Sequence, residues 1–147
     1  MRISSRCFIF KDDKIVLIYR ENQGEIYYVF PGGKVEDGET NEQCVVREVK
    51  EELGLDVTVD KYVYEVHGEG FVQHFFKVNW VSGELGTGDK EEYSRDRKGG
   101  LQVPMLVDIS KLSELDIVSP PIKKQLLEDI ATFGLELDNN KKVIIEN

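Results

Sequence analysis

The stretch Gly33–Leu55, GKVEDGETNEQCVVREVKEELGL, carries three glutamates at helical spacing. Residues three and four apart lie side by side on a helix, so we expect Glu48, Glu51 and Glu52 along one side of it. Like charges in that arrangement destabilise an isolated helix by roughly 0.2–0.5 kcal/mol per pair, a penalty that a bound cation removes. Magnesium takes oxygen ligands and needs only a few carboxylates beside substrate phosphates. The stretch therefore predicts a site for a hard divalent cation.

The expected helix is marked at both ends. Thr40 followed by Gln43 is the pattern of a capping box, in which each side chain satisfies a backbone N–H near the start of the helix. Gly54 can adopt the left-handed conformation that ends a helix. Four apolar residues between these marks fall on one stripe: Val45, Val46, Val49 and Leu53. Glu48 and Glu52 flank that stripe, so the acidic group is expected beside the core, at the floor of a cleft.

A glycine-rich segment, Phe30–Glu39 (FPGGKVEDGE), precedes the helix. Glycines let main-chain carbonyls and amides come close to a ligand, so this segment is predicted to be a loop that cradles the ion or a phosphate. The carbonyl of Gly32 or Gly33 is a candidate metal ligand, and Gly33 is expected to need a left-handed backbone. Glu36 and Asp37 are interpreted as turn residues.

The whole stretch resembles the Nudix box, G-x5-E-x7-R-E-U-x-E-E-x-G-U, where U is aliphatic. Every fixed position is matched, in the order Gly33, Glu39, Arg47, Glu48, Val49, Glu51, Glu52, Gly54 and Leu55. Nine specified positions within one short window make the match specific. Without this pattern, Glu51 and Glu52 would be interpreted as part of a solvated helix face.

The resemblance implies an α/β fold, a Nudix-type α/β/α sandwich with a central mixed β-sheet, formed by residues 1–147 as a single domain. It also implies Mg²⁺-dependent hydrolysis of a phosphoanhydride, with Mn²⁺ as a substitute ion. The implied metal ligands are Gly32, Glu48, Glu51 and Glu52, and Glu48 is also a candidate general base. Glu39 and Arg47 are expected to form a structural pair that fixes the loop against the helix.

Further site residues lie outside the helix. Many family members add an acidic residue from a later loop; the candidates here are Glu91, Glu92 and Asp96, and Glu92 is the one chosen. The catalytic candidates are therefore Glu48, Glu52 and Glu92. The candidate substrate contacts are Arg20, Tyr28, Gly33 and Lys34. The aromatic residues Phe71, Phe75, Phe76 and Trp80 alternate between sheet faces, so part of this group is core and one or two rings remain to stack on a nucleobase.

Composition limits the partners. The net charge is −9, from 19 basic and 28 acidic residues, which argues against a nucleic-acid surface because phosphate-backbone affinity requires clustered Lys and Arg. A small phosphorylated substrate, most simply a nucleotide, is expected instead. The chain has no apolar run long enough for a membrane span and no signal peptide pattern, so a cytoplasmic location is expected. Cys7 and Cys44 are interpreted as buried thiols. The sequence leaves homodimer formation open.

Outside the glycine-rich segment, runs of β-branched and aromatic residues predict strands at 3–10, 15–19, 26–30, 55–66, 71–81, 101–107 and, at an edge, 142–145. Pro120 and Pro121 open a second amphipathic helix that Gly134 ends. Residues 82–100 are glycine-rich and charged and are predicted to form a long surface loop. Strands interleaved with two helices predict a layered arrangement with one helix on each face of a sheet.

The leading hypothesis is hydrolysis of a nucleoside diphosphate linked to another group, such as a nucleoside triphosphate or a damaged nucleotide, to a nucleotide plus phosphate or pyrophosphate. The alternative is a catalytically silent Nudix-fold module that binds or senses a nucleotide. A third hypothesis, an isomerase acting on isopentenyl diphosphate, is disfavoured because no cysteine stands in a matching context. Isolated His67 and His74 are interpreted as packed or surface histidines.

Overall fold

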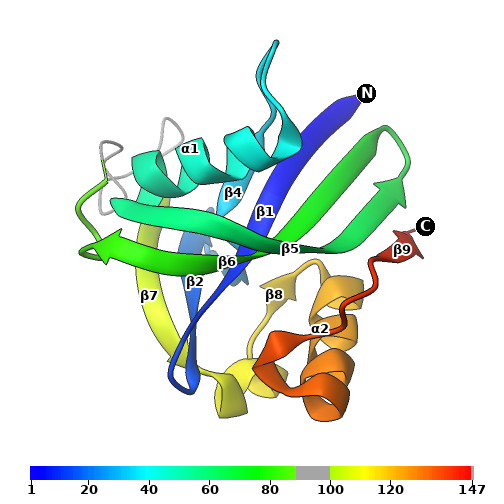
Figure 1. The fold of residues 1–147 in the computed structure, drawn as a ribbon. Helices are drawn as coiled ribbons and strands as arrows, with labels where there is room; N and C mark the ends of the chain where they lie inside the picture. The colour runs from blue at the N-terminus through cyan, green and yellow to red at the C-terminus, as the bar shows by residue number, and fades with distance from the viewer. Residues whose placement is uncertain (89–99, 147) are drawn as a thin grey trace.

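The computed structural model describes residues 1–88 and 100–146, which form one mixed sheet and two α-helices (Figure 1). The strands are β1 (Arg2–Lys11), β2 (Lys14–Asn22), β3 (Glu25–Val29), β4 (Gly32–Lys34), β5 (Leu55–Gly68), β6 (Phe71–Gly83), β7 (Leu101–Asp108), β8 (Ile117–Val118) and β9 (Lys142–Ile145). The α-helices are α1 (Asn41–Leu53) and α2 (Pro120–Phe133), and two short 3-10 helices are η1 (Ile109–Glu114) and η2 (Gly134–Glu136).

The sheet has the strand order β8-β3-β2-β1-β6-β5-β9, with β4 also paired to β1 and β7 to β2. The predicted hairpin of β1 and β2 exists, but the two strands pair only at Phe10–Ile15 and Lys11–Lys14. Away from this turn they part. β1 runs parallel to β6 and antiparallel to β4, while β2 pairs with β3 and β7. One half of the sheet is therefore built on β1, with β4 and β6, and the other on β2, with β3 and β7.

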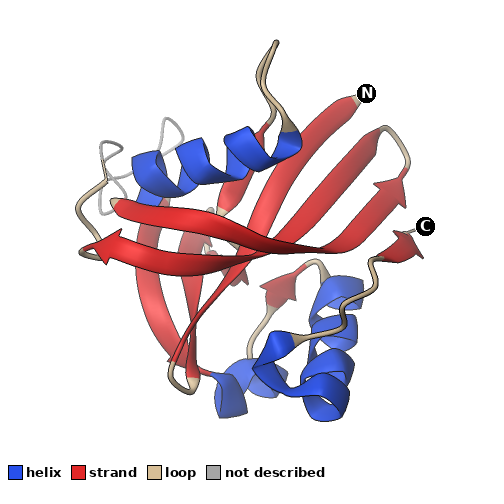
Figure 2. Cartoon of the chain, in the orientation of Figure 1, coloured by secondary structure: helices blue, strands red, loops and turns tan. Residues whose placement is uncertain are grey.

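Each face of the sheet is covered by one helix (Figure 2). Val45, Val49 and Leu53 of α1 pack into a core cluster with Cys7 and Ile9 of β1. On the opposite face, α2 contributes Ile122 and Leu126 to a second cluster whose centre is aromatic: Phe8, Phe30, Tyr64 and Phe75. The ring centroids of Phe8 and Phe75 lie 5.4 Å apart in a stacked arrangement, a favourable aromatic geometry. The predicted three-layer arrangement is confirmed.

Helix α1 begins and ends where the sequence predicts. The Thr40 hydroxyl accepts a hydrogen bond from the Gln43 amide at 3.0 Å, and the Gln43 side chain accepts one from the Thr40 amide at 2.9 Å. Gly54 is left-handed, with φ of 77°. One position of the predicted apolar stripe is wrong, because Val46 is 37% exposed and Cys44 is buried in its place. Both cysteines are buried free thiols, as expected.

Other predictions need correction. The expected glycine loop contains a strand, β4, because Gly32, Gly33 and Lys34 pair with Arg6, Ser5 and Ser4 of β1. The expected surface loop at 82–100 begins later, since β6 extends to Gly83, and residues 89–99 lie outside the described part of the chain. The short strand β8 and the helix η1 had no signal in the sequence pattern. The predicted strand β9 is confirmed and pairs in parallel with β5.

The two ends of the described chain meet at the turn between β5 and β6. The Arg2 amide donates to the Gly70 carbonyl at 2.9 Å, and the Glu146 amide donates to the His67 carbonyl at 2.8 Å. Figure 1 shows the N- and C-termini on the same side of the molecule as this turn. None of the helices within residues 1–88 and 100–146 has the length and apolar character needed to cross a bilayer.

Candidate active site

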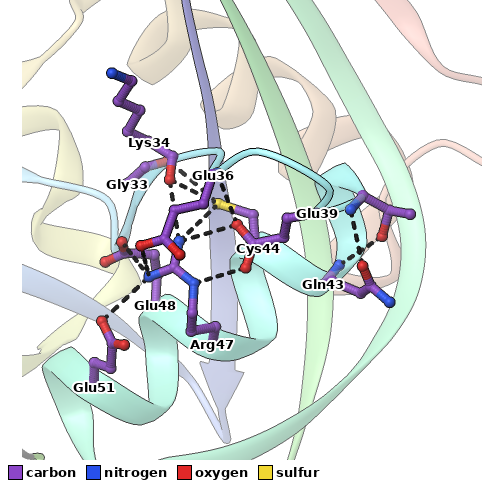
Figure 3. A network of polar contacts seen from close by, with 10 residues as sticks. Gly33, Lys34, Glu36, Glu39, Gln43, Cys44, Arg47, Glu48 and Glu51 are labelled. Atoms are coloured by element: carbon purple, nitrogen blue, oxygen red, sulfur yellow. Dashed lines mark hydrogen bonds and ion pairs between the residues drawn. The ribbon is translucent and has the colours of Figure 1, made fainter.

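Arg47 of α1 joins the helix to the segment that precedes it (Figure 3). Its Nε donates to Glu39 Oε2 at 2.7 Å and its Nη2 donates to Glu39 Oε1 at 3.0 Å, which is a bidentate pair. Nη2 also donates to the Lys34 carbonyl at 3.1 Å. The guanidinium therefore holds the end of β4 and the loop after it against α1, the geometry expected for a structural pair.

The same guanidinium contacts further carboxylates. Its Nη1 donates to Glu48 Oε1 at 2.9 Å and to Glu51 Oε2 at 3.2 Å. Glu36 lies 3.6 Å from Nη1, so this residue, interpreted from sequence as part of a turn, also faces the cluster. The Arg47 guanidinium thus offsets the repulsion among the acidic side chains that the helical spacing brings together.

These contacts change the protonation of the Glu39–Arg47 pair. The hydrogen bonds from Arg47 lower the pKa of Glu39 to about 2, against the opposing effect of burial. The hydrogen bonds to Glu39 raise the pKa of Arg47 above its ordinary value, and Glu48 adds to this effect. Both groups are therefore charged across the physiological range. Burial raises the pKa of the neighbouring Cys44 thiol to about 11, so this cysteine is not a reactive thiolate.

Glu48 and Glu52 line a cleft of about 310 Å³ together with Gly32 and Gly33. The Gly32 amide donates to Glu52 Oε1 at 2.9 Å, which fixes that carboxylate beside β4. Gly32 has a φ of 145° and a Cβ there would lie 2.1 Å from the Ser5 carbonyl oxygen, so the position requires glycine. A Cβ on Gly33 would lie 2.5 Å from the Glu48 carboxyl carbon. The two glycines leave room for the carboxylates.

Most of the other residues that line the cleft are basic: Arg2, Arg6, Arg20 and Lys34. Arg20 and Lys34 were predicted as substrate contacts from sequence, and the structure brings both to the cleft. Arg2, Arg6 and Gln102 were missed. Arg6 donates to the Phe30 carbonyl at 2.8 Å; burial lowers the pKa of its guanidinium, while Glu52 raises it. An arginine inside the apolar run ISSRCFIF was the signal that could have identified it.

The donor set of the cleft fits a hard divalent ion. Glu48 and Glu52 supply carboxylate oxygens, and magnesium bound with substrate phosphates needs only one or two such ligands. Glu51, a predicted ligand, contacts Arg47 and is not among the residues that line the cleft. In the described part of the chain, no three His, Cys, Asp or Glu side chains form a ready-made ligand group. Glu48 and Glu52 could therefore supply part of the coordination shell of such an ion.

The remaining candidates lie elsewhere. Tyr28 packs against Tyr19, with ring centroids 5.6 Å apart, and does not line the cleft. His74 contacts the Tyr62 hydroxyl, and burial lowers the pKa of its imidazole. His67 bonds Glu65 at 2.7 Å. Glu92 lies outside the described residues, so its role stays a prediction.

Comparison with known proteins identifies the family. The chain is 46% identical over 81 residues to CTP pyrophosphohydrolase of Escherichia coli (strain K12), covering 51% of this chain and 60% of that protein. It is 47% identical over 125 residues to the NAD-capped RNA hydrolase NudC of Vibrio atlanticus (strain LGP32), covering 80% of this chain and 41% of that protein. The chain thus spans about half the length of these relatives.

A solved NUDIX hydrolase from Nitrosomonas europaea has the same fold, with a TM-score of 0.72 at 17% identity, covering 99% of this chain and 79% of that chain. This likeness confirms the predicted Nudix-type sandwich. The family model described as NUDIX domain matches residues 1–110, which include β1 to β7 and the whole acidic helix. The protein therefore belongs to the NUDIX domain family.

Proposed function

We propose that this protein hydrolyses a phosphoanhydride of a nucleoside diphosphate derivative, most simply a nucleoside triphosphate, with magnesium or manganese as cofactor. The observation that carries the proposal is the composition of one cleft, in which Glu48 and Glu52 face the basic side chains of Arg6, Arg20 and Lys34. Carboxylates there suit a divalent cation, and arginines suit phosphate oxygens. The names of the E. coli and V. atlanticus relatives, for CTP and NAD-capped RNA, agree with this chemistry.

The residues of the chain have distinct proposed tasks. Arg20 and Lys34 bind phosphate oxygens and oppose the negative charge that grows on them during the reaction. Glu48 accepts a proton from the attacking water. Glu52, oriented by the Gly32 amide, holds the ion together with Glu48. When bound, the ion supplies charge neutralisation and lowers the pKa of a coordinated water. Glu39 and Arg47 keep the carboxylates in place.

Several expectations remain part of this proposal. Gly32 through its carbonyl and Glu51 complete the proposed ligand set, and Glu92 is a proposed catalytic residue of the later loop. Tyr28 and Gly33 remain proposed substrate contacts. We also propose that residues 1–147 form a single domain, that the protein is cytoplasmic, and that its partner is a small nucleotide rather than nucleic acid. Homodimer formation stays open. Since one relative is named for capped RNA, the substrate panel below includes a capped oligonucleotide.

A substrate panel tests the proposal. Purified protein is incubated with the four ribonucleoside triphosphates, ADP-ribose and an NAD-capped oligonucleotide, each with magnesium, with manganese and with EDTA. We expect metal-dependent release of a nucleotide plus phosphate or pyrophosphate, and running the reaction in water labelled with heavy oxygen identifies the attacked phosphorus. Thermal stabilisation by nucleotides without product under any condition would instead support the silent binding module.

A further inference from the structure

Strand β9 forms one end of the sheet. The strand order finishes at β9, and within residues 1–88 and 100–146 no strand pairs with its outer side. Figure 1 shows β9 at the rim of the molecule, beside the C-terminus. An edge strand presents a row of backbone groups that can pair with a further strand. The outer side of β9 is therefore a candidate surface for contact with another chain.

Two residues of β9 combine an outward-directed backbone with an exposed side chain. The Glu146 amide donates to the His67 carbonyl of β5 at 2.8 Å. Successive residues of a strand direct their N–H and C=O to opposite sides, so Ile144 also bonds toward β5, while Val143 and Ile145 direct theirs to the outer side. The side chains of Val143 and Ile145 are 57% and 66% exposed. Both are apolar and β-branched, the type that strands favour.

Lysines near this edge do not protect it from pairing. An edge lysine deters a further strand through its charge. Here Lys141 Nζ lies 3.0 Å from Glu65 Oε1, and Lys142 Nζ lies 2.5 Å from Asp129 Oδ1. Both charges are thus compensated within the chain. The four residues of β9 also include no proline, the residue that would remove an outward N–H.

We propose that β9 pairs antiparallel with β9 of a second copy of this chain, across a twofold axis at Ile144. In this register Val143 of each copy lies opposite Ile145 of the other, and the two residues exchange both N–H···O=C bonds. The side chains of these residues from both copies gather on one face of the joined sheets. The same surface serves both copies, as in the twofold contacts that most homodimers use.

The charges at the ends of this segment select a second copy as the occupant. Residues 142–146, KVIIE, carry a positive charge at one end and a negative charge at the other, with apolar residues between them. Antiparallel pairing at Ile144 places Lys142 opposite Glu146, and opposite charges across two strands are favourable. Parallel pairing would place each charge opposite its own copy. The segment is therefore complementary to itself in one orientation.

The oligomeric state tests the proposal without reference to catalysis. Sedimentation equilibrium is measured from about 10 µM to about 1 mM protein, and because β9 is short we expect a weak dimer with a dissociation constant of about 0.1–1 mM. Ile145→Pro removes the outward N–H but leaves the bonds to β5, so it should weaken the dimer about tenfold or more. Ile145→Val keeps the N–H and the apolar side chain, and this matched control should dimerise as wild type does.

Cysteine cross-linking tests the register. Residues that exchange both hydrogen bonds have Cα atoms about 5.5 Å apart, within the range that a disulfide spans. A mixture of Val143→Cys and Ile145→Cys proteins should therefore form a disulfide-linked dimer under mild oxidation. Either variant alone should form much less, because its two cysteines lie farther apart across the axis. The native Cys7 and Cys44 are buried and should not interfere.

Two sets of results would overturn the proposal. The first is a protein that keeps the mass of one chain at about 1 mM, or a dimer that is equally stable in Ile145→Pro of native circular dichroism. The second is a mixture of the two cysteine variants that cross-links no more than either variant alone. Hydrolysis of the substrate panel is unaffected by any of these results, so the proposed function stands or falls separately.

Discussion

At the scale of single residues, Arg47 connects most of the acidic side chains of the site. One guanidinium contacts Glu39, Glu48 and Glu51, so it neutralises part of a cluster that would otherwise repel itself. Its side chain is only 23% exposed, which limits screening by solvent. Removing one partner of such a pair leaves the other charged and poorly solvated, so the effects of substitutions in this cluster should not be additive.

Glu52→Gln should lower turnover about 100-fold or more, because a carboxylate that faces the proposed ion becomes a neutral amide. The fold should persist, since the Gln carbonyl can still accept the Gly32 amide bond. Initial rates at saturating magnesium and a thermal melt measure the two effects. Glu42→Gln, at an exposed position of the same helix, is the matched control and should behave as wild type. Wild-type turnover in Glu52→Gln would exclude this carboxylate from the reaction.

Glu39→Gln should reduce the free energy of unfolding at pH 7 by about 1.5–3 kcal/mol, the scale of a charged hydrogen bond. Because the folded-state pKa of Glu39 is lowered from an ordinary 4.5 to about 2, its contribution is fully present above about pH 4.5 and is lost as pH falls toward 2. Urea unfolding at several values between pH 7 and pH 3 should show the difference from wild type shrinking. A difference that stays constant over this range would contradict the linkage.

Some site residues were predictable and others were not. The helical spacing of Glu48, Glu51 and Glu52, and the resemblance to the Nudix box that implies the Glu39–Arg47 pair, both belong to one segment, so these residues could be predicted from sequence. Arg6 reaches the same cleft only because β1 pairs with β4, a contact between residues 26 positions apart in the pairing of Arg6 with Gly32. Glu146 comes to line a cavity beside this cleft through the pairing of β9 with β5. Local pattern contains no information about such long-range pairing.

At the scale of elements, strand β4 determines how closely the glycine segment approaches the acidic helix. Pairing with β1 holds Gly32 and Gly33 against Glu52 and Glu48. From sequence, Gly33 was expected to need a left-handed backbone. That reason is wrong, since Gly32 has the positive φ and Gly33 is required by its contact with Glu48.

Gly33→Ala should therefore act on activity more than on stability. The added Cβ displaces the flexible end of Glu48, which the fold tolerates, while misplacement of a catalytic group by about 1 Å can cost about 100-fold in rate. Gly32→Ala should lose both, because its Cβ meets the Ser5 backbone. Rates and urea unfolding of the two variants give the comparison. The control is Gly38→Asn, at a left-handed position with open space around it. Equal loss of stability in Gly32→Ala and Gly33→Ala would contradict this distinction.

At the scale of the whole molecule, a buried polar group connects α2 to the sheet. Asp129 of α2 is 2% exposed and accepts hydrogen bonds from the Tyr64 hydroxyl of β5 at 2.6 Å, from Gln125 and from Lys142 of β9. These bonds hold together two elements, α2 and β9, that the matched family region at 1–110 does not include. Ser119, the N-cap residue of α2, and Glu146, which follows β9, both line a cavity of about 420 Å³ beside the cleft.

Asp129→Ala should cost about 2 kcal/mol in the free energy of unfolding, because the buried Tyr64 hydroxyl loses its acceptor. Urea unfolding monitored by circular dichroism measures this loss. Glu128→Ala, the exposed neighbour on the same helix, is the control and should change stability by less than about 0.5 kcal/mol. A similar small change in both variants would show that the junction does not depend on the polar group.

The attachment of Arg2 and Glu146 to the β5–β6 turn has a practical consequence for anyone who prepares this protein. Both residues also line a cavity of about 420 Å³ that adjoins the cleft of Glu48 and Glu52. Any polypeptide joined at either end, whether an affinity tag or a flanking domain, starts close to a residue that lines this cavity. Fusion partners should therefore be cleaved before kinetic work.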